Sequence, residues 1–126
     1  MKKFGLLGEH LGHSFSPMIH KAFGDYSYEL FEVPPSKLEK FICSNYYDGL
    51  NVTIPYKQAV LPYLDEVSWR AKKIGSVNTI VYKNGKRIGD NTDYCGFRYM
   101  VESSGVSPAG KKVIVLGSGG ASRAVC

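Results

Sequence analysis

The sequence predicts an α/β fold, in which a mostly parallel sheet with one antiparallel strand is covered by helices on both faces. Short apolar stretches typical of strands alternate along the chain with stretches that repeat apolar residues at helical spacing. Late in this order, Asn84-Gly85 stands between two strand-like stretches and predicts a tight hairpin, which accounts for the antiparallel strand. A glycine-rich turn at Gly117–Ala121 then predicts the start of a second, Rossmann-type unit.

Strands are predicted where short apolar or alternating stretches end at a glycine, a proline or a polar turn. The strands predicted in this way are Phe4–Leu7, Tyr28–Val33, Gly49–Thr53, Ser76–Tyr82 and Lys86–Gly89. A further stretch, Val113–Leu116, is continuously apolar and predicts a buried parallel strand in front of the glycine turn.

Helices are predicted from their caps and stops. Ser16 is placed to cap a helix that has Pro17 at its first position, and Asp65 is placed to cap another that ends at Gly75. Residues 36–39 form a capping box. Further helices are predicted to start at Pro55, to span Tyr94–Ser104 and to open at Ser122. The apolar residues expected to face the core are Ile19, Ala22, Phe23, Leu38, Phe41, Ile42, Val60, Leu61, Val67, Ala71, Ile74, Phe97, Met100 and Val101.

A connector, Ser107–Gly110, predicts the domain boundary. We expect residues 1–104 to form a substrate-binding and catalytic α/β domain. Residues 105–126 are then the connector and the beginning of a dinucleotide-binding domain. One strand, one glycine loop and one helix start cannot hold adenine or ribose, so we expect the 126-residue chain to be inactive by itself.

Composition narrows the class of protein. The 126 residues carry a net charge of +5, but the basic residues are spread out and form no stripe with interleaved aromatics, which disfavours a nucleic-acid partner. The three cysteines are odd in number and far apart, which favours a reduced, cytoplasmic compartment. No apolar run is long enough for a membrane span. The oligomeric state is not predicted.

Two serines precede the first predicted helix. Backbone N–H groups and the helix dipole at that end favour an anion, and the hydroxyls of Ser14 and Ser16 could hold a carboxylate. A role of Ser16 as a helix cap alone is the open alternative. His10, His13 and His20 have no acidic or cysteine cluster beside them, so no metal site is predicted.

Lys57 and Asp93 are the candidate catalytic pair. Lys57 falls in the first turn of a helix, where the dipole disfavours a cation, and this placement favours proton exchange. A surface lysine packing on a neighbour is its alternative. Asp93 ends the polar cluster Gly89–Asp93, which either presents it to a ligand hydroxyl or forms a capping turn.

Several motifs in order along nearly the whole chain resemble the shikimate dehydrogenase family. The matching stretches are His13–Pro17, Asn51–Lys57, Gly75–Thr79, Gly89–Asp93 with Gly96, and Gly117–Ala121. The resemblance implies NADPH-dependent reduction of 3-dehydroshikimate to shikimate, in the pathway to aromatic amino acids. It also implies that the phosphates of NADP meet the glycine loop, which comprises Gly117, Ser118, Gly119, Gly120 and Ala121.

The resemblance also assigns roles within the substrate domain. It implies that Ser14 and Ser16 bind the substrate carboxylate, that Thr53 and Asn78 hold ring hydroxyls, and that Lys57 and Asp93 are catalytic. Two alternatives stay open: a quinate/shikimate dehydrogenase of the same fold, and a non-catalytic ligand-binding module. The second is disfavoured because a pure binder needs no proton donor such as Lys57.

Overall fold

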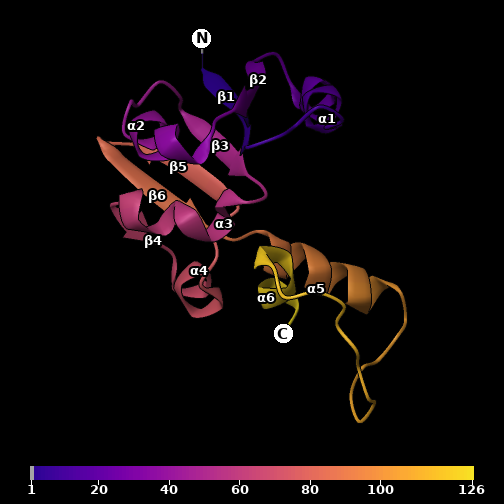
Figure 1. The fold of residues 1–126 in the computed structure, drawn as a ribbon. Helices are drawn as coiled ribbons and strands as arrows, with labels where there is room; N and C mark the ends of the chain where they lie inside the picture. Colours follow the sequence, from indigo (N-terminus) through magenta and orange to yellow (C-terminus); the bar gives the residue numbers. More distant parts are fainter. Residues whose placement is uncertain (1) are drawn as a thin grey trace.

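A computed structural model describes residues 2–126 and contains one six-stranded sheet (Figure 1). The strands lie in the order β2-β1-β3-β5-β6-β4. Their bounds are β1 Lys3–Gly8, β2 Ser27–Glu32, β3 Gly49–Val52, β4 Glu66–Val67, β5 Thr79–Lys83 and β6 Lys86–Asp90. Every predicted strand up to β6 is present, with ends that differ by a few residues.

The sheet has one antiparallel strand, as predicted. β1 pairs in parallel with both β2 and β3, and β4 pairs in parallel with β6. β5 is antiparallel to β3 on one side and to β6 on the other. The β5–β6 hairpin turns at Asn84 and Gly85, which both have positive φ, 54° and 76°, as a type I′ turn requires. The predicted fold class is confirmed.

Short helices and turns connect the strands. The α-helices are α1 Ser16–Phe23, α2 Leu38–Ile42, α3 Tyr56–Ala59, α4 Trp69–Ile74, α5 Asp93–Ser103 and α6 Gly120–Val125, with single 3₁₀ turns at η1 Pro35–Lys37 and η2 Leu61–Tyr63. The core joins residues of β1, β3 and β5 to residues of α2, α3 and α4. Its buried members are Leu7, Val33, Leu38, Ile42, Tyr47, Leu50, Val52, Tyr56, Val60, Ala71, Val77 and Ile80.

The predicted caps are wrong at three helices. Phe15 occupies the N-cap position of α1, and Ser16 is the first helical residue with no capping bond. The box at residues 36–39 is replaced by a 3₁₀ turn, and its serine makes no cap. Asp65 does not cap α4, because Ser68 does so by accepting a hydrogen bond from the Ala71 N–H at 3.2 Å.

Two apolar faces predicted to be buried are open instead. No residue of α1 or α5 is buried, and Ile19, Phe23 and Met100 are exposed. Helical spacing predicts an inward apolar face for both helices. In the structure each helix lies to the side of the sheet and does not cover one of its faces (Figure 1). By contrast, Leu38 and Ile42 of α2 are buried, and Phe41 packs against the core, as predicted.

Val113–Leu116 is not a strand, which corrects the prediction. The stretch has no regular structure, and Ile114 and Leu116 are almost fully exposed. A strand needs a neighbour to pair with its N–H and C=O groups, and no described strand lies beside this one. The glycine turn is nevertheless followed by α6, which packs beside α5 (Figure 1).

Candidate active site

The polar side chains predicted to form a site lie at one edge of the sheet. Ser14 follows β1, Thr53 follows β3 and Asp93 follows β6, so all three lie beyond the carboxyl ends of parallel strands. Asn78 precedes β5, but β5 runs antiparallel, so its start lies at that same edge. The Val52 N–H donates to the Asn78 carbonyl at 2.7 Å and holds the two segments together. Sheet topology therefore gathers these groups from distant parts of the sequence.

Lys57, Asp93 and Asn78 form one hydrogen-bonded cluster. The Lys57 ammonium donates to Asp93 Oδ2 at 2.5 Å, and Asn78 Nδ2 donates to Asp93 Oδ1 at 2.9 Å. The side chain of Lys57 is 16% exposed and that of Asp93 is 36% exposed. One carboxylate oxygen thus meets a cation and the other meets an amide, while solvent still reaches the pair. Such a site can present an ammonium to a ligand without leaving either charge unpaired.

Asn78 is held rigidly by its own partners. Its Oδ1 accepts from the Thr92 N–H at 2.9 Å and from the Thr79 hydroxyl at 3.0 Å. Its Nδ2 is shared between Asp93 and the Thr92 hydroxyl at 2.9 Å. Both the oxygen and the nitrogen of the Asn78 amide are therefore hydrogen-bonded, which fixes the orientation of the amide and of Asp93.

The turn before α5 positions Asp93. Asn91 is fully buried; its Nδ2 donates to the Ser76 carbonyl at 2.9 Å, and its Oδ1 accepts from the Asp93 N–H at 3.0 Å. Asp93 is also the first residue of α5, where the positive end of the helix dipole favours a carboxylate. The capping turn and the presentation of Asp93 to a site, which the sequence left as alternatives, are compatible in this structure.

The α3 segment places Lys57 at the sheet edge. The Lys57 carbonyl accepts from the Val77 N–H at 2.7 Å, and the neighbouring Tyr56 is 2% exposed. The Tyr56 hydroxyl donates to the Val33 carbonyl, and burial raises the pKa of this phenol. A buried tyrosine beside Lys57 anchors the segment. The side chain of Lys57 is only 16% exposed and its ammonium meets Asp93, so Lys57 is not the surface lysine that was its alternative.

Ser14 and Ser16 lie next to each other at the start of α1. The Ser14 hydroxyl accepts a hydrogen bond from the Ser16 N–H at 3.2 Å. The Ser16 hydroxyl itself makes no capping bond to α1. Capping alone therefore does not explain Ser16. The two hydroxyls and the positive end of the helix dipole remain suited to an anion.

Tyr28 and Asn51, whose side chains the sequence analysis did not single out, lie in contact in this region. The Tyr28 hydroxyl donates to Asn51 Oδ1 at 2.8 Å, and the Tyr28 ring stacks on His20 with centroids 3.8 Å apart. Burial raises the pKa of Tyr28 to about 12, so the phenol stays protonated and can donate. A polar Asn51 inside an otherwise apolar strand was the signal that could have identified this contact.

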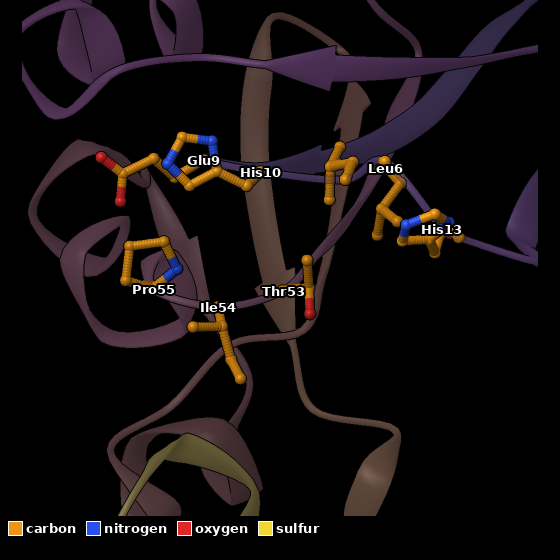
Figure 2. Close-up of a pocket in the computed structure, with 10 residues that line it drawn as sticks. Leu6, Glu9, His10, His13, Thr53, Ile54 and Pro55 are labelled. Atoms are coloured by element: carbon orange, nitrogen blue, oxygen red, sulfur yellow. The ribbon is translucent and has the colours of Figure 1, made fainter.

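A cavity of about 610 Å³ opens at the same edge. Figure 2 shows its two walls, residues 9–13 after β1 and residues 53–55 after β3. Ser14 and Thr53 line it, whereas Ser16, Lys57, Asn78 and Asp93 are not among the described residues that do so. The structure thus places Ser14 and Thr53 on the cavity and groups Lys57 and Asn78 around Asp93, whereas Ser16 belongs to neither group.

The glycine loop has room on its open side. Gly117 has φ +115°, a conformation that favours glycine, and an added Cβ at Gly117 or Gly119 would meet nothing within 4 Å. The Gly119 backbone leads directly into α6. The loop therefore fits a phosphate group that approaches the backbone closely.

The described residues 2–126 offer no metal site and no membrane span. No group of three or more His, Cys, Asp or Glu side chains in them could hold a metal ion. No described helix is long and apolar enough to cross a membrane.

The chain is similar in sequence to known proteins of one family. Residues 6–80 match the family described as the shikimate dehydrogenase substrate binding domain. A shikimate dehydrogenase (NADP(+)) from Symbiobacterium thermophilum is 49% identical over 129 residues, which cover 96% of this chain and 44% of that protein. A second, from Clostridium perfringens, is 48% identical and covers 99% of this chain and 49% of its own length. The chain spans about half the length of the curated relatives it matches.

A solved structure has the same fold over the same range. Shikimate dehydrogenase 1 from Peptoclostridium difficile superposes with a TM-score of 0.95 at 40% identity, over 99% of this chain and 51% of that one. The six-stranded sheet and the family match over residues 6–80 define an α/β substrate-binding domain. The chain belongs to the shikimate dehydrogenase family.

Proposed function

We propose that this chain is the substrate-binding part of an NADP-dependent oxidoreductase that reduces 3-dehydroshikimate to shikimate. The observation that carries the proposal is the cluster of Lys57, Asp93 and Asn78 beside a cavity at the sheet edge. Membership of the family supplies the substrate class. A binding module without chemistry would gain nothing from an ammonium held on a carboxylate at such an edge.

Ring hydroxyls and the carboxylate of the substrate match the polar groups of the site. Ser14 and Ser16 would bind the carboxylate, and Thr53 and Asn78 would hold ring hydroxyls. These four residues come from different elements, so together they can fix the orientation of a small ring, as an oxidoreductase requires.

Lys57 would act on the oxygen of the reacting carbon. When a hydride reaches a ketone, negative charge develops on the oxygen, and an ammonium stabilises that charge and donates a proton to it. Asp93 would hold the Lys57 ammonium in position, through the hydrogen bond at 2.5 Å. In the reverse direction, the neutral Lys57 amine would accept the hydroxyl proton and become the ammonium.

The glycine loop would hold the phosphates of NADP. The residues concerned are Gly117, Ser118, Gly119, Gly120 and Ala121, and the open backbone at Gly117 and Gly119 supports this assignment. NADPH, when bound, supplies the hydride. We place the boundary between the two functional parts at residues 104 and 105, where α5 gives way to the connector.

We place the protein in the cytoplasm, with small-molecule rather than nucleic-acid partners. The three cysteines are free in the described chain and all are exposed, which suits a reducing compartment.

The test uses the whole protein that contains this chain. Shikimate and NADP⁺ are mixed with it, and the absorbance of reduced nicotinamide is followed. We expect shikimate-dependent reduction, lost in the near-isosteric Lys57→Met variant. Faster turnover with quinate would instead favour a quinate/shikimate dehydrogenase. Binding of shikimate without any turnover would favour the non-catalytic module and contradict the proposal.

A further inference from the structure

The first residue of α6 touches the side chain of Lys57. A Cβ added to Gly120 would lie 3.1 Å from Lys57 Cβ, 3.3 Å from Lys57 Cδ and 3.1 Å from Ser76 Oγ. Gly117 and Gly119 have no neighbour within 4 Å of the same atom. Within the loop, Gly120 is therefore set apart by what it packs against.

The neighbours of Gly120 cannot all yield to a larger residue. Ser76 is fully buried, and its carbonyl is held by the Asn91 amide at 2.9 Å. Lys57 Cβ is fixed by its backbone, whose carbonyl accepts from the Val77 N–H at 2.7 Å. The parts free to move are the outer stem of Lys57 and α6 itself.

The same lysine is held at its other end by α5. Asp93, the first residue of α5, accepts from the Lys57 ammonium, and α5 packs beside α6. The two helices thus contact Lys57 at two places, α5 at the ammonium and α6 at the aliphatic stem. Ala124, on α6, is 5% exposed, which indicates that α6 is seated rather than loosely placed.

We propose that Gly120 is a positioning residue for Lys57. Its missing side chain lets α6 approach the lysine stem and keep the ammonium on Asp93. The glycine loop and the ammonium are then parts of one packed unit, so a displacement of α6 displaces Lys57. The use of Lys57 as a proton donor rests on the proposed function, but the contact itself does not.

The test measures the accessibility of the Lys57 amine in the 126-residue chain. The chain is treated briefly with an acetylating reagent, and the modification of Lys57 is compared by mass spectrometry with that of Lys40, which is exposed. In Gly120→Ala, we expect the Lys57/Lys40 ratio to rise about fivefold, because a weakened charge-assisted hydrogen bond frees the amine. The matched control is Gly96→Ala, at an exposed position of α5 with nothing within 4 Å, which should leave the ratio unchanged.

A second variant separates positioning from general damage. Ser76→Ala removes the hydroxyl that is 3.1 Å from the added Cβ and that has no hydrogen-bond partner among the described atoms. In Ser76→Ala/Gly120→Ala only the two contacts with the Lys57 stem remain, so we expect the ratio to lie between that of Gly120→Ala and that of the unmodified chain. Circular dichroism checks that each variant is folded.

Several outcomes would overturn the proposal. It fails if Gly120→Ala leaves the ratio unchanged, or if Gly96→Ala raises it equally. If Gly120→Ala does not fold, the test uses a chain that ends at Gly119, which lacks α6 and adds no atom. An unchanged Lys57/Lys40 ratio in that chain would also overturn the proposal. The readout uses neither shikimate nor NADP⁺, so the positioning role can fail while the oxidoreductase function stands, and the reverse also holds.

Discussion

Lys57 is the residue on which the proposed chemistry depends most. Its ammonium forms a 2.5 Å hydrogen bond with Asp93, and its side chain is largely buried. We expect Lys57→Met in the whole protein to lower kcat by about 10²–10⁴-fold, the usual contribution of a positioned acid–base group. The KM for shikimate should change far less. Steady-state rates check this, and near-normal turnover would remove Lys57 from the mechanism.

The two serines before α1 should affect affinity. Ser14→Ala or Ser16→Ala should each weaken shikimate binding by about 1.5–3 kcal/mol, because each change removes a hydrogen bond to a charged group. Ser16 makes no cap in the structure, so its replacement should leave the melting temperature almost unchanged. Calorimetric titration and thermal melts measure the two effects, and a lower melting temperature with unchanged affinity would restore the capping role.

Three side chains whose roles in a site stay predictions lie together in the structure, in contacts that the sequence did not predict. Lys57, Asn78 and Asp93 were all predicted, and the structure places them in one hydrogen-bonded cluster. The central place of Asn78 could not be predicted, because its partner Thr92 comes from a segment that only the β5–β6 hairpin brings near. The contact of Tyr28 with Asn51 likewise depends on the order of the strands.

At the element scale, α4 offers a test of capping. Ser68 Oγ accepts from the Ala71 N–H and donates to Asp90 Oδ1 at 2.5 Å. Ser68→Ala should lower the free energy of unfolding by about 1 kcal/mol or more, the usual cost of a lost N-cap. Ser16→Ala is the matched control, because that serine begins α1 without a capping bond. Chemical denaturation measures both, and equal effects would contradict the assignment.

Five of the six strands were predictable, whereas β4 fell within a predicted helix and three helix caps were wrong. The alternation of apolar and polar residues and the Asn84-Gly85 turn depend only on nearby residues, so the strands they predict are present in the structure. The predicted cap at Asp65 is wrong because of contacts made by the folded chain. Asp65 pairs with Arg87 of β6, and Ser68 lies close enough to serve α4, so tertiary contacts decided which side chain capped the helix. The predicted strand at Val113–Leu116 failed because pairing, not apolarity, makes a strand.

For the whole molecule, two ion pairs set the behaviour in acid. Hydrogen bonds from Arg87 lower the pKa of Asp65 to about 2, and hydrogen bonds from Arg70 hold the pKa of Asp90 well below its usual range. A depressed folded-state pKa adds stability above the unfolded value of about 4, and this stability is lost as the pH falls toward the folded value.

We therefore expect the free energy of unfolding to fall between about pH 4 and pH 2. Asp65→Asn should flatten this part of the curve, since the substituted side chain no longer titrates. Urea denaturation at a series of pH values measures the slope. An unchanged slope in Asp65→Asn would show that this carboxylate does not control acid stability.

We expect the sheet edge of this chain to bind shikimate by itself. The most direct test is a titration of the ¹⁵N-labelled 126-residue chain with shikimate, followed by amide NMR spectra. We predict saturable shifts at Ser14, Ser16, Thr53, Lys57, Asn78 and Asp93, and much smaller shifts in Ser14→Ala at the same shikimate concentrations. Saturable shifts confined to other parts of the chain, or none at these six residues, would contradict the account.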